Sequence, residues 1–307
     1  DLSRANPGLV MVRISGFGQT GPYSDRPGYG VIGEAVSGLR HITRGPDRPP
    51  SRIAVAITDY ITGLYGALDA ALALLARGRT GRGQYVDSAL YECAFSFMEP
   101  HIPAFEKLGL VAQRAGSRLP DSTPNNLYVS GDGQFIHITA MGDAVFRRLA
   151  ACMGSPGLAD DPRFRLAVDR SRNHEAIDDL IGRWTGQHSL DRLESMLRAA
   201  DVPATRIFTI ADIFGDPHYA ARGSIVHAPD EDFGTVAMAQ PVPRLSGTPG
   251  AVRHAGRRIG QDTRRVLAEV AGLSAEELDR LEAEGVIRGD RAGAAPSANE
   301  RGRAGTA

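Results

Sequence analysis

The feature that most constrains the fold is a long apolar segment that runs from Ile57 or Thr58 to Arg77. At helical spacing, apolar side chains would occur on every side of this segment, and Gly78 follows it as a stop signal. A helix without a polar face has nothing to offer to water. We therefore expect this helix to lie in the core of a folded domain.

The composition is that of an ordinary globular protein. The 307 residues carry a formal net charge of -1, and 42% are apolar, which is enough for a sizeable core. Without a basic stripe, a general nucleic-acid or membrane-surface binder is disfavoured. The segment from Leu64 to Ala76 contains Asp69 and is too short to span a bilayer. No signal peptide is recognised, so we expect a cytoplasmic protein with no nucleic-acid or membrane partner.

The cysteines and histidines give no metal or disulfide signal. Cys93 and Cys152 lie far apart in the sequence, and no histidine pair has the spacing of metal ligands. Neither a disulfide framework nor a zinc site is therefore expected.

Short elements are predicted around the apolar helix. A β-branched run over 9–14 predicts a buried strand, and a turn-rich segment separates it from a short helix at 31–36. We further expect a strand at 84–88 and a helix at 90–107 that is interrupted near Pro100 and Pro103.

The second half begins after a loop rich in Pro, Ser, Asp and Asn, at about 115–126, which is the best candidate for a domain boundary. An Asp-Gly turn at Gly131-Asp132-Gly133 predicts a hairpin of 126–130 with 134–140. Ser274 and Glu277 form a capping box at the start of the last helix. Helices are predicted at 143–153, 172–184, 190–200, 210–214, 263–271 and 275–284, and extended segments at 206–208 and 236–239.

A glycine motif follows the first strand. Gly16 to Gly21 match the pattern GxGxxG, which in a dinucleotide-binding fold opens a helix. Here Pro22 and then Pro27 exclude a continuous helix, so the motif fails as a dehydrogenase signal. It is either a tight turn or a loop that lets a ligand approach the backbone.

Asp59 lies at the start of the apolar helix. One interpretation is an N-cap, because an aspartate there satisfies free amide groups and complements the helix dipole. The other is a reactive carboxylate among apolar side chains, next to N–H donors that could stabilise an oxyanion. For Asp69 and Asp87, a paired or solvated structural role is the favoured interpretation.

Several segments together carry a family resemblance. In order along the chain they are 6–23, Arg26-Pro27-Gly28-Tyr29, Thr58-Asp59-Tyr60-Ile61-Thr62-Gly63, 79–87, Asp161-Pro162-Arg163-Phe164, Val202-Pro203-Ala204, Asp216-Pro217-His218 and Gly285-Val286-Ile287. This series resembles the family III CoA-transferases, or CaiB/BaiF family, which is related to formyl-CoA transferase, carnitine CoA-transferase and α-methylacyl-CoA racemase.

The resemblance implies a function for Asp59 as the nucleophile that moves CoA from an acyl-CoA to a carboxylic acid, through a mixed anhydride and an aspartyl-CoA thioester. Ser15, Gly16, Phe17 and Gly18 match a segment that lines the CoA channel. No metal is implied, and no cofactor besides CoA itself, which enters as the thioester substrate.

The resemblance also implies a fold and a division of the chain. We expect an α/β protein with a Rossmann-like large domain from 1–119 and 206–288, a smaller α+β domain over 120–205, and a disordered tail at 289–307. An interlocked homodimer is expected. The family's N-terminal segments, which contact the CoA adenosine, have no counterpart here, so weak CoA binding and little activity are expected of this chain alone.

Two alternatives remain open. An acyl-CoA racemase or isomerase of the same fold is disfavoured, because its histidine and glutamate correspond to Tyr29 and Gly142, which cannot carry the α-proton. The second alternative is a catalytically inactive truncated remnant of such an enzyme. Oxalate specificity is disfavoured, because residues 119–124 do not form a glycine-rich flap.

Overall fold

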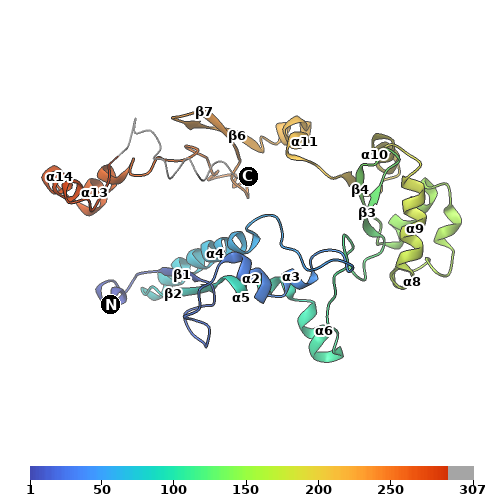
Figure 1. The fold of residues 1–307 in the computed structure, drawn as a ribbon, viewed down its shortest axis with the longest axis horizontal. Helices are drawn as coiled ribbons and strands as arrows, with labels where there is room; N and C mark the ends of the chain where they lie inside the picture. The colour runs from blue at the N-terminus through green and yellow to red at the C-terminus, as the bar shows by residue number, and fades with distance from the viewer. Residues whose placement is uncertain (290–307) are drawn as a thin grey trace. The chain divides into compact units, whose positions relative to one another are not determined.

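The computed structural model describes residues 1–289 and divides into two compact units, Asp1–Ile207 and Phe208–Ala307 (Figure 1). Each unit is described by itself. The predicted tail at 289–307 lies outside the described residues, apart from Gly289. The predicted domain boundaries at 119 and 205 stay a prediction.

The first part of the first unit is a parallel strand pair with helices around it. Strands β1 (Met11–Ser15) and β2 (Tyr85–Ala89) pair in register from Met11 with Tyr85 to Ser15 with Ala89. Helix α4 (Ile57–Thr80) connects them and contacts both strands, which makes a βαβ unit. The other helices here are α1 (Leu2–Ala5), α2 (Gly30–Val36), α3 (Leu39–Ile42), α5 (Leu90–Phe95), η1 (Ser96–Met98) and α6 (His101–Leu108). The chain is thus a mixed α/β protein, as predicted.

Two details of these helices differ from the prediction. Helix α4 passes through Gly78 and ends at Thr80; Gly81 follows with a φ of 69°, the left-handed conformation that glycine favours at a helix end. Pro103 does not interrupt α6, because it lies in the first turn, where no backbone N–H donor is needed. Pro100 does separate α6 from the preceding helical segment, as predicted.

The expectation that α4 is buried in the core is wrong for the described residues. Leu64 is 72% exposed and Leu75 66%, and Leu68 and Leu72 are more than half exposed. Buried positions such as Ile61 and Ala73 lie on one side only. The physical reason is that, among the described elements, α4 packs mainly on two strands and the short helices α2 and α5, and the leucines of its opposite face stay exposed.

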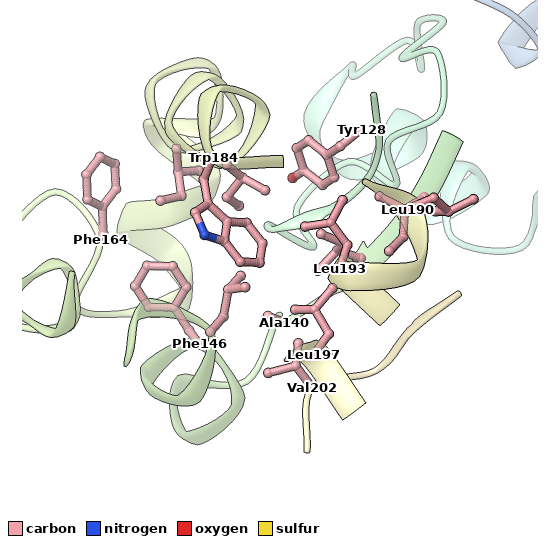
Figure 2. Packing of buried hydrophobic residues seen from close by; sticks show 14 residues of the cluster. Tyr128, Ala140, Phe146, Phe164, Trp184, Leu190, Leu193, Leu197 and Val202 are labelled. Carbon is pink, nitrogen blue, oxygen red and sulfur yellow. The ribbon is translucent and has the colours of Figure 1, made fainter. Parts of the chain in front are cut away.

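The rest of the first unit is a three-stranded antiparallel sheet with helices on it. Strand β4 (Phe135–Thr139) pairs with β3 (Asn125–Val129) and with β5 (Ala204–Arg206), so the predicted hairpin is confirmed. Figure 2 shows the buried side chains between this sheet and the helices, with Trp184 and Phe146 among them. The helical elements are α7 (Asp143–Cys152), η2 (Pro156–Ala159), α8 (Ala167–Arg172), α9 (His174–Thr185) and α10 (Leu190–Ala199).

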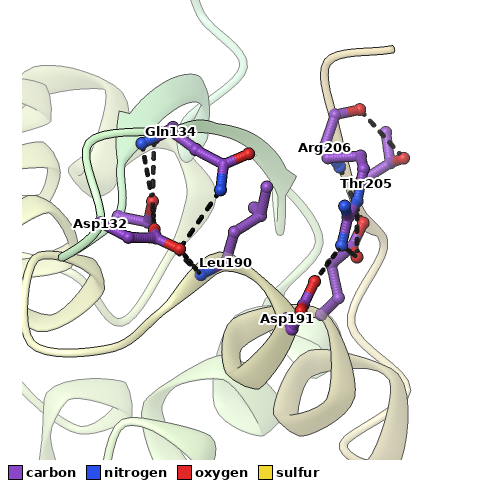
Figure 3. A network of polar contacts seen from close by, with 8 residues as sticks. Asp132, Gln134, Leu190, Asp191, Thr205 and Arg206 are labelled. Carbon is purple, nitrogen blue, oxygen red and sulfur yellow. Dashed lines mark hydrogen bonds and ion pairs between the residues drawn. The ribbon is translucent and has the colours of Figure 1, made fainter. Parts of the chain in front are cut away.

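Polar contacts connect helix α10 to the three-stranded sheet and its hairpin turn (Figure 3). Helix α10 has no side-chain cap of its own, and the Asp132 carboxylate accepts from the Leu190 N–H instead, at 3.2 Å. The hydroxyl of Ser130 also donates to Asp132, and these hydrogen bonds hold the pKa of Asp132 below its usual value. At the other end, Arg206 of β5 forms an ion pair with Glu194 of α10, which lowers the pKa of Glu194.

The second unit contains a hairpin and four helices within its described residues. Strands β6 (Ile225–Asp230) and β7 (Gly234–Ala239) pair antiparallel. The capping box of Ser274 with Glu277 is confirmed at the start of the last helix. The helices are α11 (Ile210–Gly215), α12 (Pro217–Ala221), α13 (Thr263–Ala271) and α14 (Ala275–Ala283). Over residues 1–289, no helix combines the length and apolarity that crossing a membrane requires.

Candidate functional site

Asp59 occupies the third position of α4 and is exposed. The helix begins at Ile57, and the N-cap residue is Ala56, so the interpretation of Asp59 as an N-cap is wrong. The physical reason is that the helix starts two residues before Asp59 without any side-chain cap. Among residues 1–289, none of the hydrogen bonds or ion pairs engages the Asp59 carboxylate. The Asp59 carboxylate therefore lies in the first turn of α4 without a hydrogen bond or ion pair among the described residues.

The Asp59 carboxylate lies against the bare backbone of Gly30, the first residue of α2. A Cβ atom at position 30 would come within 3.0 Å of both carboxylate oxygens, and far closer to Oδ2. Real Cβ atoms do not approach other atoms that closely, so the observed position of Asp59 requires glycine here. The sequence analysis did not identify Gly30, because only the fold brings it to Asp59.

Helix α2 is itself held against the start of α4. A Cβ at Gly33, one turn after Gly30, would come 3.1 Å from the Cγ2 atom of buried Thr58. Glu34, only 2% exposed, accepts a hydrogen bond from the Ile53 N–H at 3.1 Å. Ile53 belongs to the loop that leads into α4, so α2 holds both the first turn of α4 and the segment before it.

The glycine motif forms a loop with fixed geometry. No helix begins between Gly16 and Tyr29 in this described segment, in agreement with the failed dehydrogenase signal. The Ser15 hydroxyl accepts from the Gly18 N–H at 3.0 Å, and Gly18 has a φ of +87°, which favours glycine. The Asp87 carboxylate of β2 accepts from the Gln19 N–H at 2.9 Å. Asp87 therefore has the paired structural role that was predicted.

Phe17 is held by aromatic neighbours. Its ring lies 5.6 Å from that of Tyr23, edge to face, and 6.0 Å from that of Tyr91. The loop thus keeps its shape through ring contacts as well as hydrogen bonds.

The segment 28–30 connects the glycine loop to Asp59. A Cβ at Gly16 would come 2.8 Å from the Cα of Gly28, so these two backbones touch. Gly30, two residues further on, touches the Asp59 carboxylate. Two residues span at most about 7 Å. The loop 15–18 and the carboxylate therefore belong to one neighbourhood, although 41 positions separate Gly18 from Asp59 in the sequence.

The two cysteines are weaker candidates for a nucleophile than Asp59. Partial burial raises the pKa of the Cys93 thiol and of the Cys152 thiol, and both cysteines are free. A thiol with a raised pKa is protonated at neutral pH and is a poor nucleophile. Asp59 is the better candidate for covalent chemistry. In the part of the chain that the structure describes, no three His, Cys, Asp or Glu side chains gather as metal ligands.

Comparison with known proteins identifies the class as the CoA-transferases. The chain belongs to CoA-transferase family III, whose family model matches residues 1–263. Both the predicted family and the predicted enzyme class are confirmed. Transfer of CoA between an acyl-CoA and a carboxylic acid is the activity of this family.

Similar proteins include two from Chloroflexus aurantiacus. A succinyl-CoA–D-citramalate CoA-transferase is 44% identical over 94% of this chain and 71% of its own length. The β subunit of a succinyl-CoA–L-malate CoA-transferase is 38% identical over 93% of this chain and 71% of its own length. The crystal structure of a CaiB/BaiF family protein from Brucella suis matches with a TM-score of 0.74 and 32% identity, over 87% of this chain and 69% of that one.

Proposed function

We propose that this chain moves CoA from a dicarboxylic acyl-CoA, such as succinyl-CoA, to a hydroxylated dicarboxylic acid, with Asp59 as the nucleophile. The substrate class is supported by relatives at 44% and 38% identity that are named for succinyl-CoA with citramalate or malate. The role of Asp59 is supported by one observation above all: its exposed carboxylate lies on bare glycine backbone beside the glycine loop.

In the first half of the reaction, an Asp59 oxygen attacks the carbonyl carbon of the thioester. The C–S bond breaks, CoA thiolate leaves with the electron pair, and a mixed anhydride remains. A thiol with a pKa of about 8–9 is a good leaving group. The thiolate then attacks the aspartyl carbonyl carbon, so the donor carboxylate departs and an aspartyl-CoA thioester forms.

In the second half, the acceptor carboxylate attacks the aspartyl thioester and expels CoA thiolate, which gives a second mixed anhydride. The thiolate attacks the acceptor carbonyl carbon, and Asp59 is released as a carboxylate. No proton and no external base is needed, because carboxylate and thiolate alternate as nucleophile and leaving group. In this scheme Ser15, Gly16, Phe17 and Gly18 line the path of the CoA arm, and the contact of Gly16 with Gly28 supports a path that ends at Asp59.

Hydroxylamine trapping tests this proposal. Hydroxylamine attacks the aspartyl carbonyl of the thioester, releases CoA thiolate and leaves a hydroxamate. We expect mass spectrometry of the chain incubated with succinyl-CoA and hydroxylamine to locate the hydroxamate at Asp59, and none without succinyl-CoA. If no hydroxamate forms, the alternative of a catalytically inactive remnant is favoured.

A separate measurement in deuterated water tests the racemase alternative. Uptake of deuterium at the α-carbon of the acyl-CoA without an acceptor acid would favour a racemase.

Substitution of Gly30 by alanine should impair catalysis without unfolding the protein. The new Cβ would overlap the Asp59 carboxylate, which can rotate away because it ends a flexible side chain. A displacement of about 1 Å at a reacting group costs about 100-fold in rate, so we expect kcat for CoA exchange to fall by about that factor, with an unchanged midpoint of thermal unfolding.

Gly78→Ala in α4 is the matched control, because a Cβ at position 78 meets open space. It should leave kcat unchanged and stabilise the helix by about 0.5–1 kcal/mol. Equal kcat values for Gly30→Ala and the wild type would show that the contact with Asp59 does not position the nucleophile.

We also propose a homodimer with a Rossmann-like large domain. The βαβ unit of β1, α4 and β2 supports the Rossmann-like architecture. Exposed apolar side chains on α4, and Phe105 and Leu108 on α6, support an interface, since such surface is costly to leave in water. Light scattering after size-exclusion chromatography should give twice the chain mass; a monomer at micromolar concentration would contradict the dimer.

A further inference from the structure

The second unit contains a cavity of about 390 Å³ whose polar lining is cationic. Arg222, Gln240 and Arg244 supply its polar side chains, and no carboxylate lines it. The remaining lining residues are Gly223, Pro241, Pro249 and Gly250. This cavity was not anticipated from the sequence and has no part in the proposed chemistry of Asp59.

The two arginine side chains of the cavity have no partner within the described residues, as is true of Arg253 and Arg288, whereas the other described arginines of this unit are paired. Within the described residues, neither the Arg222 guanidinium nor the Arg244 guanidinium forms a hydrogen bond or an ion pair. Five other arginines of the same unit pair with its carboxylates, namely Arg257, Arg258, Arg264, Arg265 and Arg280. No ion pair within the described residues therefore offsets the charge of these two guanidinium groups.

The walls of the cavity are tied together. The Gln240 side-chain amide donates to the Gly250 carbonyl at 3.2 Å, and its backbone N–H donates to the Ser224 carbonyl at 2.9 Å. A Cβ at Gly250 would come 2.8 Å from the Cβ of Pro241, so these two walls are in close contact. These contacts connect residues 224, 240, 241 and 250 around the cavity.

We propose that this cavity binds a phosphate monoester through Arg222 and Arg244. The planar guanidinium fork matches phosphate oxygens in a bidentate manner. Two unpaired guanidiniums at one cavity match a single group with a charge near -2 better than a carboxylate with a charge of -1, and a phosphate monoester carries about -1.5 to -2 at neutral pH. The 3′-phosphate of CoA and a separate phosphorylated metabolite both present this group.

Calorimetric titration of the full chain with inorganic phosphate tests the site. We expect saturable binding that the double variant R222Q/R244Q weakens at least ten-fold, because it removes two charge-assisted interactions. The control is Arg253→Gln, which removes an exposed arginine of the same unit that does not line the cavity. It should leave the affinity unchanged. Circular dichroism of both variants should match the wild type.

The source of the phosphate is resolved by titration with CoA and with dephospho-CoA. If R222Q/R244Q lowers the affinity for CoA but not for dephospho-CoA, the bound group is the 3′-phosphate of CoA. If CoA does not compete with phosphate for binding, the site takes a separate phosphorylated ligand. Absence of saturable phosphate binding, or an equal loss in Arg253→Gln, would overturn the proposal. Phosphate binding does not depend on Asp59, so its failure would leave the proposed nucleophile untouched.

Discussion

Replacement of Asp59 by asparagine should lower CoA exchange at least about a thousand-fold, the range of losses seen when a covalent nucleophile is removed. Asparagine has nearly the same shape, but its amide cannot form the anhydride. The fold should persist, because no hydrogen bond within residues 1–289 depends on the Asp59 carboxylate. The exchange of labelled CoA between succinyl-CoA and succinate measures the effect, and the hydroxamate should vanish with it.

The control for this variant is Asp69→Asn, on the same helix and with the same chemical change. Asp69 is half-buried and lies more than two turns further along α4, away from Gly30. We expect exchange within about two-fold of the wild type, since a change away from the reacting atoms leaves the transition state intact. If Asp59→Asn retained exchange within about ten-fold of the wild type, another group would have to form the covalent bond.

Local signals in the sequence predicted local structure well. The Asp-Gly turn at Gly131-Asp132-Gly133 gave the hairpin of β3 and β4, since this turn type depends on the residues of the turn itself. The capping box of Ser274 with Glu277 likewise involves only neighbours. Strand β6 was not predicted; it contains Pro229, which disfavours the interior of a sheet but is tolerated here because both strands of a two-stranded sheet are edge strands.

Features that depend on distant partners could not be predicted from periodicity. Burial of α4 was expected from its composition, but burial requires a surface to pack against, and here two strands cover only one side. The cap of α10 comes from Asp132, 58 positions away from Leu190. Local sequence at the helix start gives no sign of it.

The residues of the candidate site also differ in whether the sequence alone could identify them. Asp59 was identified, because a carboxylate at the start of an apolar helix has few interpretations and the family resemblance chose between them. Gly30 was not, because its need for a bare Cα comes entirely from the position of Asp59. A glycine that serves a tertiary contact looks in the sequence like any turn glycine. The structure adds Gly30 as a contact of the proposed nucleophile, whereas Asp59 itself was proposed from the sequence.

The second large effect is expected at Arg170, the largest fully buried side chain among the described residues. Its guanidinium donates to the carbonyls of Thr123 at 3.1 Å and of Phe164 at 2.9 Å, and it forms an ion pair of 2.8 Å with Asp143. It also lies over the Phe146 ring, 4.6 Å from its centre. One side chain therefore joins the segment before β3, the start of α7 and the turn before α8.

Arg170→Met should lower the free energy of unfolding by about 3–5 kcal/mol, because methionine fills the space but leaves buried carbonyl groups without donors and Asp143 without its partner. Urea unfolding followed by the fluorescence of Trp184, the only tryptophan of the chain, reports on the same core. Arg172→Met is the control: this side chain is 73% exposed and lies 3.8 Å from Asp169, so the change should stay within about 0.5 kcal/mol. Similar midpoints for the two variants would show that the buried guanidinium is not what joins these segments.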